Sequence, residues 1–340
     1  MKAALLRDYH RPLELVERPE PEPDGPRSVV VRIGGAGVCA TDLHAIDGLM
    51  EPAGLKPPVV LGHENAGWVH AAGDDVTAAA VGDPVLVYPA YSCGLCVPCR
   101  RGLDVHCDRH QFTGLTRDGG FADFVLVDER SLLTLPPNVE PAEVAPHADA
   151  GITAYHAVKK LLPRLVPGST VAIVGVGGVG HIALQLVRVL GASRVVGIDT
   201  DERRRGLARE LGADEVLGEQ EDVADAVREL TNGAGADVVL DFVGTDETHA
   251  SGLQMLARLG LYSIVGYGGI VSHPSVGFVV GETVVAGNLV GSWIDLWELL
   301  QLQGRGDVTL RTEMHALDDV NEVLDRLREG EITGRAVLVP

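Results

Sequence analysis

Four of the five cysteines in the 340-residue chain stand within one short loop, at Cys93, Cys96, Cys99 and Cys107. Such a cluster suits either a disulfide staple or a metal site. The first three recur every third residue and the fourth returns from a short loop, so four thiolates can converge tetrahedrally on one zinc ion. Disulfides between residues three apart would close very small loops and stabilise little. The spacing favours zinc, and four protein ligands leave no position for a substrate, which predicts a structural ion.

A second group of residues has the spacing of a dinucleotide site. Gly175, Gly177 and Gly180 of "VGVGGVG" form a GxGxxG pattern between a strand-like run and a helix-like run. Glycines there permit a tight turn and a close approach of the backbone to a pyrophosphate. Asp199 ends the next strand-like run, where a carboxylate can accept both ribose hydroxyls and repel a 2′-phosphate. This predicts NAD, although the arginines at 203–205 could hold a 2′-phosphate, and a glycine turn with a strand-capping aspartate is the structural alternative.

Alternating strand and helix patterns must position that glycine turn. From residue 170, "TVAIVG" and "RVVGID" read as buried strands around the helical "VGHIALQLVRVLG", in which Ile182, Leu186 and Val189 share one face. The runs "ADVVLDFVG", "LYSIVGYG" and "TVVAGNLVG" continue the pattern, and an amphipathic helix and a strand close the chain. The expected fold class is therefore α/β, with a doubly wound parallel sheet of the Rossmann type. The chain before about residue 150 is richer in short β-like runs broken by Gly and Pro.

Length and composition limit the function classes. A chain of 340 residues exceeds the size at which one core keeps growing, so two domains are expected. The formal charge of −20 disfavours nucleic acid as a partner, because phosphate binding depends on Lys and Arg. Charged residues interrupt the N-terminal segment and no long uncharged apolar run follows, which predicts no membrane segment and a cytoplasmic location. Thiols are kept reduced in the cytosol, which again favours zinc over disulfides at the cysteine cluster.

The remaining cysteine completes a familiar combination. Cys39 lies in "GVCATDLHAIDG", and His63 and Glu64 follow in "LGHENAGWV". With the four-cysteine loop, the "GVGGVG" turn and the C-terminal "GRAVLV", the whole chain resembles the zinc-dependent medium-chain alcohol dehydrogenases, most closely the bacterial NAD-dependent secondary alcohol dehydrogenases. The resemblance implies a mainly β, GroES-like catalytic domain over 1–150, a Rossmann domain over 151–290 and a return to the catalytic domain over 291–340.

In that family a catalytic zinc takes a Cys, the His of "GHE" and a third ligand, commonly Cys, just before the cofactor domain. Here four of the five cysteines belong to the loop and only Cys39 remains, so the third ligand of the catalytic zinc cannot be a cysteine. His147 and Asp149 are the nearby candidates, and matching the family's segment selects Asp149, with His147 as a wall or hydrogen-bonding residue of the pocket. Cys39, His63 and Asp149 would then hold a catalytic zinc with a fourth position for an alcohol oxygen, which makes two zinc ions per chain.

Other residues near Cys39 and His63 take roles through the same resemblance. Thr41 and His44 match a proton relay that runs through a hydroxyl, the cofactor ribose and an imidazole. Asp42 is expected to orient His63. Glu64 is expected to act as a carboxylate beside the metal that exchanges with its solvent, and not as a permanent ligand.

The resemblance also implies a set of cofactor contacts and pocket neighbours. The expected cofactor residues are Thr153, Gly175, Gly177, Gly178, Val179, Gly180, Asp199, Arg204, Val243, Gly244, Val265, Gly266 and Arg335. Arg335 would bind the pyrophosphate. The expected pocket neighbours are Trp68, His110, Phe112, Leu289 and Val290. One departure is "GSWID", which places Trp293 where relatives often have an arginine, and it puts one polar contact near the cofactor in doubt.

The expected function is reversible hydride transfer between an alcohol, most simply a secondary aliphatic or aryl alcohol, and NAD. A zinc polyol or butanediol dehydrogenase is the main alternative, although such substrates need several polar pocket groups. A nucleotide-binding regulatory protein that has lost catalysis is the alternative outside enzymes, and the retained Cys39 and His63 argue against it. Relatives join their cofactor-domain sheets across a two-fold axis, and the apolar "TVVAGNLVG" therefore predicts a homodimer or homotetramer.

Overall fold

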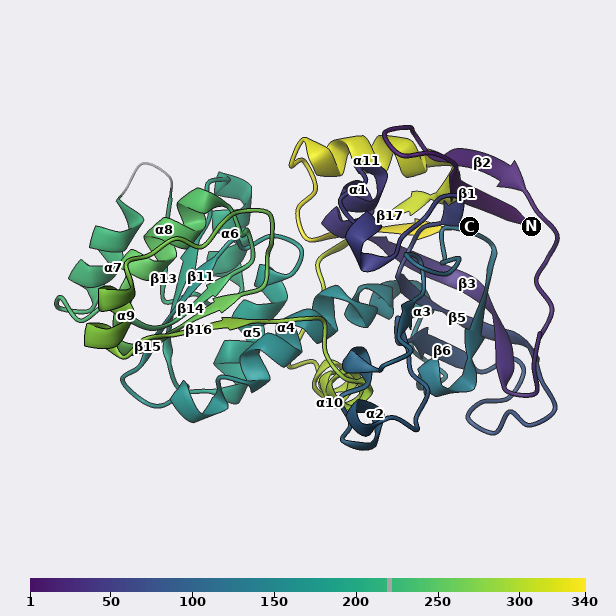
Figure 1. The fold of residues 1–340 in the computed structure, drawn as a ribbon, viewed down its shortest axis with the longest axis horizontal. Coiled ribbons are helices and arrows are strands. Elements are labelled where there is room, and N and C mark those ends of the chain that lie inside the picture. The colour runs from purple at the N-terminus through teal and green to yellow at the C-terminus, as the bar shows by residue number, and fades with distance from the viewer. Residues whose placement is uncertain (219–221) are drawn as a thin grey trace. The chain divides into compact units, whose positions relative to one another are not determined.

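The fold is described from a computed structural model that covers residues 1–218 and 222–340. The chain forms two compact units (Figure 1). The first comprises Met1–Ile152, Ser292–Leu300 and Leu310–Pro340, and the second comprises Thr153–Gly291 and Gln301–Thr309. The C-terminal strand returns to the first unit, and a short segment after residue 300 belongs to the second.

A largely antiparallel sheet organises the first unit. Its central strand β3 (Ser28–Val38) is almost wholly buried, because "SVVVRIGGAGV" carries small or β-branched residues on both faces. The strand order is β10-β6-β5-β3-β18-β17, and β9 also pairs with β3. The other strands of this sheet are β5 (Glu64–Ala72), β6 (Pro84–Val87), β9 (Phe124–Asp128), β10 (Leu132–Thr134), β17 (Thr312–Ala316) and β18 (Arg335–Val339).

Smaller elements complete the first unit around a core that includes Phe121 and Leu61. A three-stranded sheet has the order β2-β1-β4, and β7 pairs with β8. The strands are β1 (Lys2–Leu6), β2 (Glu14–Glu17), β4 (Val59–Val60), β7 (Ala90–Tyr91) and β8 (Gln111–Phe112). The helices are α1 (Ala40–Ile46), α2 (Val97–Arg100), α3 (Pro141–Val144), α10 (Trp293–Gly304), whose last residues belong to the second unit, and α11 (Val320–Arg328).

A parallel sheet forms the centre of the second unit. Its order is β13-β12-β11-β14-β15-β16, and each pair is parallel. Numbered within the sheet, this is the 3-2-1-4-5-6 order of a dinucleotide-binding fold, which confirms the expected class. The strands are β11 (Thr170–Val174), β12 (Arg194–Ile198), β13 (Glu215–Leu217), β14 (Ala236–Asp241), β15 (Leu256–Ile264) and β16 (Val284–Gly287).

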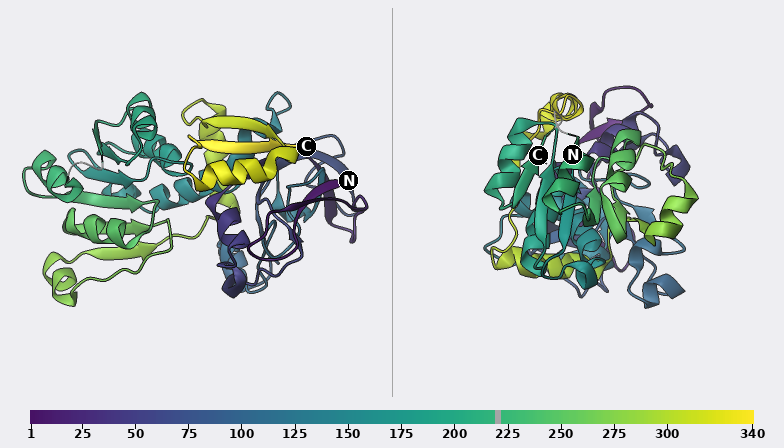
Figure 2. Two further views of the ribbon diagram at one scale, coloured as in Figure 1. Left: turned by 90° about the horizontal axis from the view of Figure 1, so that it is seen from above. Right: turned by 90° about the vertical axis from the view of Figure 1, so that its left-hand side faces the viewer.

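Helices lie on both sides of this sheet, as the right-hand view of Figure 2 shows. They are α4 (Ala150–Lys159), whose first turn belongs to the first unit, α5 (Gly180–Leu190), α6 (Glu202–Glu210), α7 (Val223–Leu230), α8 (Asp246–Gln254) and α9 (Ser275–Gly281). Side-chain oxygens of Asp201, Asp222 and Thr245 accept backbone N–H groups at the starts of α6, α7 and α8. These caps explain why the helices begin where they do.

The three apolar positions that share one face of α5 differ in burial. Ile182 and Leu186 are fully buried, but Val189 is 39% exposed. Val189 belongs to the last turn, beside Arg188, whose guanidinium forms an ion pair with Asp214 at the surface. The apolar periodicity therefore continues one turn beyond the buried part of the helix.

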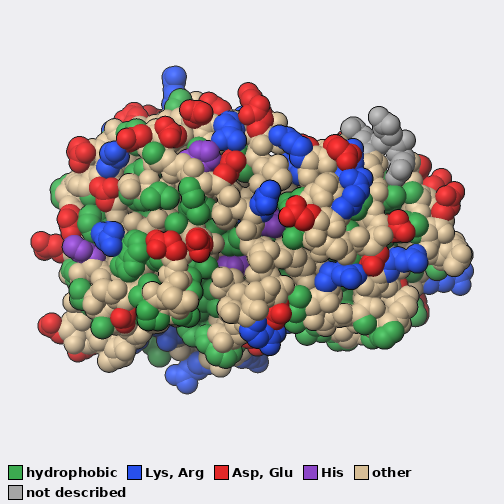
Figure 3. Space-filling view, turned by 180° about the vertical axis from the view of Figure 1, so that it is seen from behind, with side chains coloured by type: hydrophobic (Ala, Val, Ile, Leu, Met, Phe, Trp, Pro, Cys, Tyr) green, Lys and Arg blue, Asp and Glu red, His purple; other side chains and the backbone are tan. Residues whose placement is uncertain are grey.

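The surface carries charges of both signs. On the face that Figure 3 shows, Asp and Glu side chains are interspersed with Lys and Arg. Within residues 1–218 and 222–340, every helix is too short or too polar to cross a bilayer.

Candidate active site

Three side chains from distant parts of the sequence meet in the first unit. Cys39 follows β3 and caps the start of α1, His63 directly precedes β5, and Asp149 directly precedes α4. One donor atom from each lies within 4.8 Å of the others. The Oδ2 atom of Asp149 is 3.7 Å from Sγ of Cys39 and 3.5 Å from Nε2 of His63. Cys39 and His63 are buried, at 7% and 1% exposure.

The separations of these donors suit a tetrahedral zinc ion. Ligands at about 2.0 to 2.3 Å from zinc in tetrahedral directions lie roughly 3.3 to 3.8 Å from one another. The two measured distances from Oδ2 of Asp149 fall in that range. Nε2 of the buried His63 has no hydrogen-bond partner of good geometry among the described residues. A buried polar atom without a partner needs an explanation, and coordination of a cation supplies one.

The electrostatics of the cluster also favour a cation. Burial alone would lower the pKa of His63, but the carboxylates of Asp42 and Asp149 raise it well above its ordinary value. Burial would raise the pKa of Asp149, and contact with His63 lowers it. The cluster thus attracts positive charge, and a thiolate, a carboxylate and a neutral imidazole would balance Zn²⁺ formally.

Two carboxylates support the cluster from behind. One oxygen of Asp42 accepts the backbone N–H of Cys39 at 2.9 Å, and the other lies 3.3 Å from Nδ1 of His63. Oε1 of Glu64 accepts hydrogen bonds from the Ala150 N–H and from the Arg335 guanidinium. Glu64 and Arg335 are both buried, so each compensates the charge of the other. Burial raises the pKa of Glu64 and Arg335 opposes that rise.

The other predicted site residues of the first unit differ in their contacts and exposure. The ring of Phe112 lies 6.1 Å from that of His63. His110 is exposed, and the ring of Trp68 packs beneath the guanidinium of Arg32 at 4.4 Å. Thr41 and His44 are partly exposed and occupy positions three apart on α1, where side chains are neighbours on a helix surface.

His147 is buried but is not one of the three clustered donors. It lies in the short helical turn Ala145–Ala148, and a Cβ atom at Gly151 would approach its Nδ1 to 2.3 Å. The ring therefore packs against the first turn of α4. This position is compatible with the expected role of His147 as a wall or hydrogen-bonding residue of the pocket.

The four-cysteine loop forms a second donor cluster in the first unit. Sγ of Cys96 lies 3.3 Å from that of Cys99 and 3.8 Å from that of Cys107, and all four sulfurs lie within 4.8 Å of one another. All are free thiols, so the disulfide alternative does not describe this structure. Hydrogen bonds from the backbone of Leu95 and Cys96 lower the pKa of Cys93 to about 6. Thiolates held by backbone N–H groups are suitable ligands for zinc.

In the second unit, the expected cofactor residues gather at one edge of the parallel sheet. Val174 pairs in register with Ile198 and with Asp241, and Asp241 pairs with Ile264. The residues that follow these strands therefore share the carboxyl edge, on both sides of the central strand β11. This is where doubly wound sheets bind nucleotides. The residues at this edge are Gly175, Gly177, Gly178, Val179, Gly180, Asp199, Val243, Gly244, Val265 and Gly266.

The glycine turn leaves room for a ligand. Gly175 has φ +85°, and a Cβ atom at Gly180 would lie 1.8 Å from the carbonyl oxygen of Gly175. At Gly177 a Cβ atom would meet nothing within 4 Å. Gly175 and Gly180 are thus required by the turn itself. The Cα atom of Gly177 faces open space beside the N-terminus of α5, where a pyrophosphate would fit.

The Asp199 carboxylate accepts backbone hydrogen bonds from the loop after β11 and from the loop after β12. One carboxylate oxygen accepts the Val176 N–H at 2.8 Å and the other accepts the Asp201 N–H at 2.9 Å. A carboxylate oxygen can accept more than one hydrogen bond, so both oxygens retain capacity for ribose hydroxyls. Of the arginines that follow, Arg203 pairs with Asp201 and Arg205 with Glu202.

The remaining predicted residues lie on other elements of the two units. Trp293 begins α10 in the first unit, where its N–H donates to Asp104 and its Nε1–H donates to the Leu132 carbonyl. Thr153 lies on α4, and Leu289 and Val290 follow β16; all three belong to the second unit. Arg335 is buried with Glu64, and its expected contact with a pyrophosphate stays a prediction.

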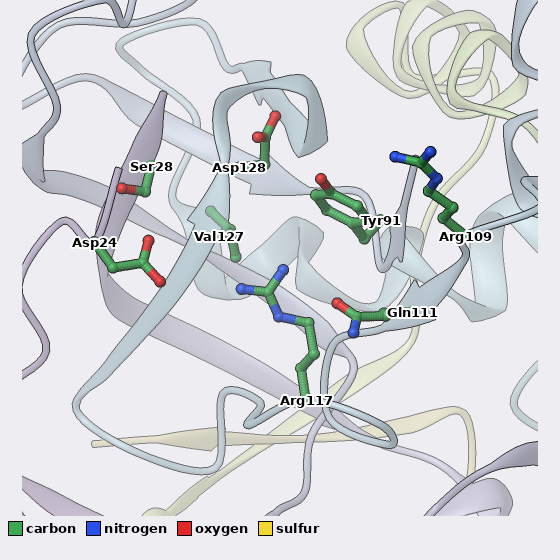
Figure 4. A pocket seen from close by; sticks show the side chains of 8 residues that line it. All are labelled: Asp24, Ser28, Tyr91, Arg109, Gln111, Arg117, Val127 and Asp128. Carbon is green, nitrogen blue, oxygen red and sulfur yellow. The ribbon is translucent and has the colours of Figure 1, made fainter. Parts of the chain in front are cut away.

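A surface pocket of about 510 Å³ in the first unit is separate from the donor clusters in its lining (Figure 4). Arg117 lies 5.5 Å from the centroid of the Tyr91 ring. Carboxylates of Asp24 and Asp128 line the same pocket as Arg109 and Arg117. The opposite charges compensate one another within this hollow.

The parallel nucleotide-type sheet and the buried thiolate–imidazole–carboxylate set define the class of a zinc-binding dehydrogenase. Comparison with known families agrees. Residues 25–137 match the family described as "Alcohol dehydrogenase GroES-like domain", and residues 178–303 match "Zinc-binding dehydrogenase". The chain belongs to the zinc-dependent medium-chain alcohol dehydrogenase family.

Relatives cover the whole chain. The D-arabinose 1-dehydrogenase (NADP(+)) of Saccharolobus solfataricus is 36% identical over 100% of this chain and 97% of its own. The NAD-dependent alcohol dehydrogenase of Sulfurisphaera tokodaii is 33% identical over all of both chains. The crystal structure of the alcohol dehydrogenase from Aeropyrum pernix is 44% identical, covers 100% of both chains and superposes with a TM-score of 0.98. The names of these relatives give different substrates, so they do not decide the substrate of this chain.

Asp241 was missed as a site residue by sequence analysis. Its carboxylate binds the backbone of the loop after β14. The available signal was an aspartate that ends a buried strand and directly precedes the proposed cofactor residues of "DFVGT".

Proposed function

We propose that this NAD-dependent zinc alcohol dehydrogenase acts reversibly on secondary alcohols and the corresponding ketones. The observation that carries the proposal is the meeting of Cys39, His63 and Asp149 in one buried cluster. Three protein ligands leave a coordination position open, as catalytic zinc sites require. Zinc bound there would supply a Lewis acid for the oxygen of the alcohol or ketone.

The residues around the cluster have separate tasks in this proposal. Asp42, with one oxygen 3.3 Å from Nδ1 of His63, would keep that nitrogen protonated, so that Nε2 is available as a ligand. Thr41 would accept the alcohol proton at its hydroxyl, and His44 would pass it to solvent from its imidazole. Burial lowers the pKa of His44, although Asp47 opposes this, so the imidazole is neutral near pH 7 and can accept a proton. Phe112 would supply an apolar wall beside the imidazole ligand.

NAD is favoured over NADP by Asp199. Its buried carboxylate lies at the carboxyl edge of the sheet and would face a 2′-phosphate with like charge. We retain Thr153, Val179, Arg204 and Arg335 as proposed cofactor contacts through the family resemblance. We also propose a cytoplasmic location, because the cysteines are unpaired thiols.

A dehydrogenase of polyols or sugars is the second candidate, and it is favoured by the relative that is named a D-arabinose 1-dehydrogenase. A substrate panel separates the two. The purified protein is assayed with NAD and NADP on 2-butanol, 1-butanol, 2,3-butanediol, sorbitol and D-arabinose, after its zinc content has been measured. We expect two zinc ions per chain and the highest kcat/KM with NAD and 2-butanol. Preference for D-arabinose or sorbitol would establish the second candidate, and one zinc ion or no turnover would overturn the proposal.

We further propose that the protein is a homodimer or a homotetramer built from dimers. Strand β16 forms one end of the parallel sheet, and its Val284 and Val285 are 42% and 37% exposed. The preceding helix α9 exposes Val276, Val279 and Val280. An apolar edge of this kind is normally covered, and a second copy could continue the sheet. Light scattering should give twice or four times the mass of the chain, and a monomer at micromolar concentration would contradict this.

A further inference from the structure

Asp241 connects the two loops that follow β14 and β15 in the second unit. Its Oδ1 accepts the N–H of Val243 at 2.8 Å and that of Gly244 at 3.0 Å. Its backbone carbonyl accepts the N–H of Val265 and that of Gly266, each at 2.9 Å. One residue thus binds the backbone of four positions, and all four are proposed cofactor contacts.

Two further polar side chains hold the other carboxylate oxygen. Tyr262, on β15, donates its hydroxyl proton to Oδ2 of Asp241. Nδ1 of His249, on α8, lies 2.7 Å from the Tyr262 hydroxyl oxygen and 3.4 Å from Oδ2 of Asp241. Because the hydroxyl proton is directed to Asp241, His249 must donate its Nδ1 proton to the hydroxyl oxygen. The three side chains form a chain of donors that ends on the aspartate.

This chain lies in an apolar core. Asp241 and Tyr262 are fully buried and His249 is 2% exposed, and Tyr262 packs in the hydrophobic cluster of the second unit. Apolar residues of similar shape could fill the same space at little or no loss of stability. Buried polar groups in such a network instead fix one geometry, because each group loses its partner when another rotates. Two buried polar side chains, Tyr262 and His249, thus fix the orientation of the Asp241 carboxylate.

Two glycines show how closely the elements around Asp241 pack against one another. A Cβ atom at Gly252 of α8 would lie 2.5 Å from the Tyr262 ring, so the glycine lets the ring reach Asp241 beneath the helix. Gly244 has φ +76°, and a Cβ atom there would lie 2.3 Å from the Gly266 carbonyl group. The two loops therefore pack backbone against backbone. A rotation of Asp241 would disturb both loops together.

We propose that Tyr262 and His249 are positioning residues for the dinucleotide, acting through Asp241 on the loops at Val243–Gly244 and Val265–Gly266. The inference rests on the proposed function of this sheet edge as the NAD site. Neither side chain would touch a bound cofactor, since both are buried. Their loss should weaken cofactor binding without changing the chemistry at saturating cofactor.

The test is Tyr262→Phe, which removes the hydroxyl from the chain and keeps the ring. NADH is titrated by its fluorescence, and steady-state kinetics give kcat and the KM for NAD. Loss of a hydrogen bond to a charged group should raise the Kd of NADH and the KM for NAD about tenfold. The kcat at saturating NAD should stay within about twofold of the parent protein, and zinc content should not change. His249→Leu, which keeps the Tyr262–Asp241 bond, should raise the Kd about threefold, and His249→Gln should restore it through the amide donor.

Tyr9→Phe is the matched control, because Tyr9 donates to the Leu55 carbonyl in the first unit. It should leave the Kd of NADH unchanged. If Tyr262→Phe does not fold, the His249→Leu and His249→Gln pair carries the test. A folded Tyr262→Phe protein with a Kd within twofold of the parent, or with kcat lowered at an unchanged Kd, would overturn the positioning role. Failure of the unmodified protein to bind NADH would instead overturn the proposed function.

Discussion

Nε2 of His63 lies 3.5 Å from Oδ2 of Asp149, although the two residues are 86 positions apart in the sequence. With Cys39, this pair predicts that Asp149 is the third ligand of a zinc ion. Asp149→Asn removes one negative charge from the donor set and should weaken zinc binding at this site by more than about 100-fold, beyond the loss typical of an outer partner. Metal analysis after dialysis should then give one zinc ion per chain in place of two.

His147→Asn is the matched control for Asp149→Asn, because His147 is buried two residues away and lies outside the donor cluster. It should retain two zinc ions and alter mainly the preference among substrates. Asp149→Cys restores the ligand type common in the family and should also retain both ions. Equal zinc loss from the two asparagine variants would leave the ligand unassigned, and loss in His147→Asn alone would show that His147 is the ligand.

The two donor clusters should respond differently when one cysteine of each is replaced by serine. Cys96→Ser removes one of four ligands from the closed site, so we expect one zinc ion fewer and a Tm lower by several degrees, since about 1 kcal/mol shifts Tm roughly 2 to 4 °C in domains of this size. Cys39→Ser should abolish turnover at nearly unchanged Tm. Serine is a favourable helix N-cap, and Cys39 is the N-cap of α1. Differential scanning calorimetry with zinc analysis measures both, and a larger fall in Tm for Cys39→Ser would reverse the assignment.

The parallel sheet was predictable because its strands are continuous apolar runs. Val171–Val174 and Val238–Leu240 are buried on both faces, and such runs bounded by glycine are recognisable in a sequence. The glycine turn and the cysteine loop were recognisable because their chemistry depends on short spacing. Long-range pairings carry no such signal. The contact of Tyr262 with Asp241 and that of Trp293 with Asp104 depend on how distant segments pack.

The third zinc ligand shows the same limit. Cysteine arithmetic excluded a third cysteine, but nothing in the spacing of "APHADAG" distinguishes His147 from Asp149. The family resemblance was needed to choose, and only the fold brings Asp149 beside Cys39. Val189 shows another limit, because it shares a helical face with Ile182 and Leu186 and the periodicity does not reveal that this face is exposed in the last turn.

Two alanine substitutions in the glycine turn should separate binding from stability. Gly177→Ala would place a methyl group in open space and should raise the Kd of NADH about tenfold or more with little change in Tm, since the methyl would occupy the proposed pyrophosphate position. Gly180→Ala would push against the Gly175 carbonyl and should lower stability by about 1 to 3 kcal/mol. Gly206→Ala, at an uncrowded position of α6, should raise stability by about 0.5 to 1 kcal/mol and leave NADH binding unchanged. Unchanged NADH affinity in Gly177→Ala would place the pyrophosphate elsewhere.

Asp199 should determine the choice between NAD and NADP. Asp199→Gly removes the carboxylate that would repel a 2′-phosphate, and kcat/KM for NADPH should rise relative to NADH by at least about tenfold. The variant also loses the acceptors of the Val176 and Asp201 N–H groups, so stability should fall by about 1 to 2 kcal/mol. The ratio of the two kcat/KM values is the measurement. Faster turnover of NADPH than of NADH by the unmodified protein would refute the role of this carboxylate.

A buried carboxylate outside both donor clusters, Glu129, provides a pH test of the fold. Oε2 of Glu129 accepts the N–H groups of Thr77 and Ala78 at 2.8 and 3.2 Å, and Oε1 accepts from Nε of Arg27 at 2.7 Å. Glu129 is 6% exposed. The backbone donor of Thr77 lowers the pKa of Glu129 below its ordinary value, with Ala78 and Arg27 adding to the effect against burial. The ionised carboxylate therefore stabilises the loop at residues 77–78 against the strand that precedes Glu129.

Glu129→Gln keeps the shape of the side chain and removes the charge. At pH 7 we expect the variant to be less stable by about 1 to 3 kcal/mol, because an amide NH₂ would face donors that now meet carboxylate oxygens. Since the pKa is lower in the folded than in the unfolded chain, the stabilisation is complete above the unfolded value of about 4.3 and is lost as pH falls through the folded value. The difference in unfolding free energy between parent and variant should therefore shrink as pH decreases below about 4.5.

Urea titrations of both proteins from pH 7 to pH 3.5 measure this difference. The exposed Glu22→Gln is the control, and it should show no difference from the parent at any pH. A difference that stays constant over this range would show that shape, and not ionisation, accounts for the effect of Glu129.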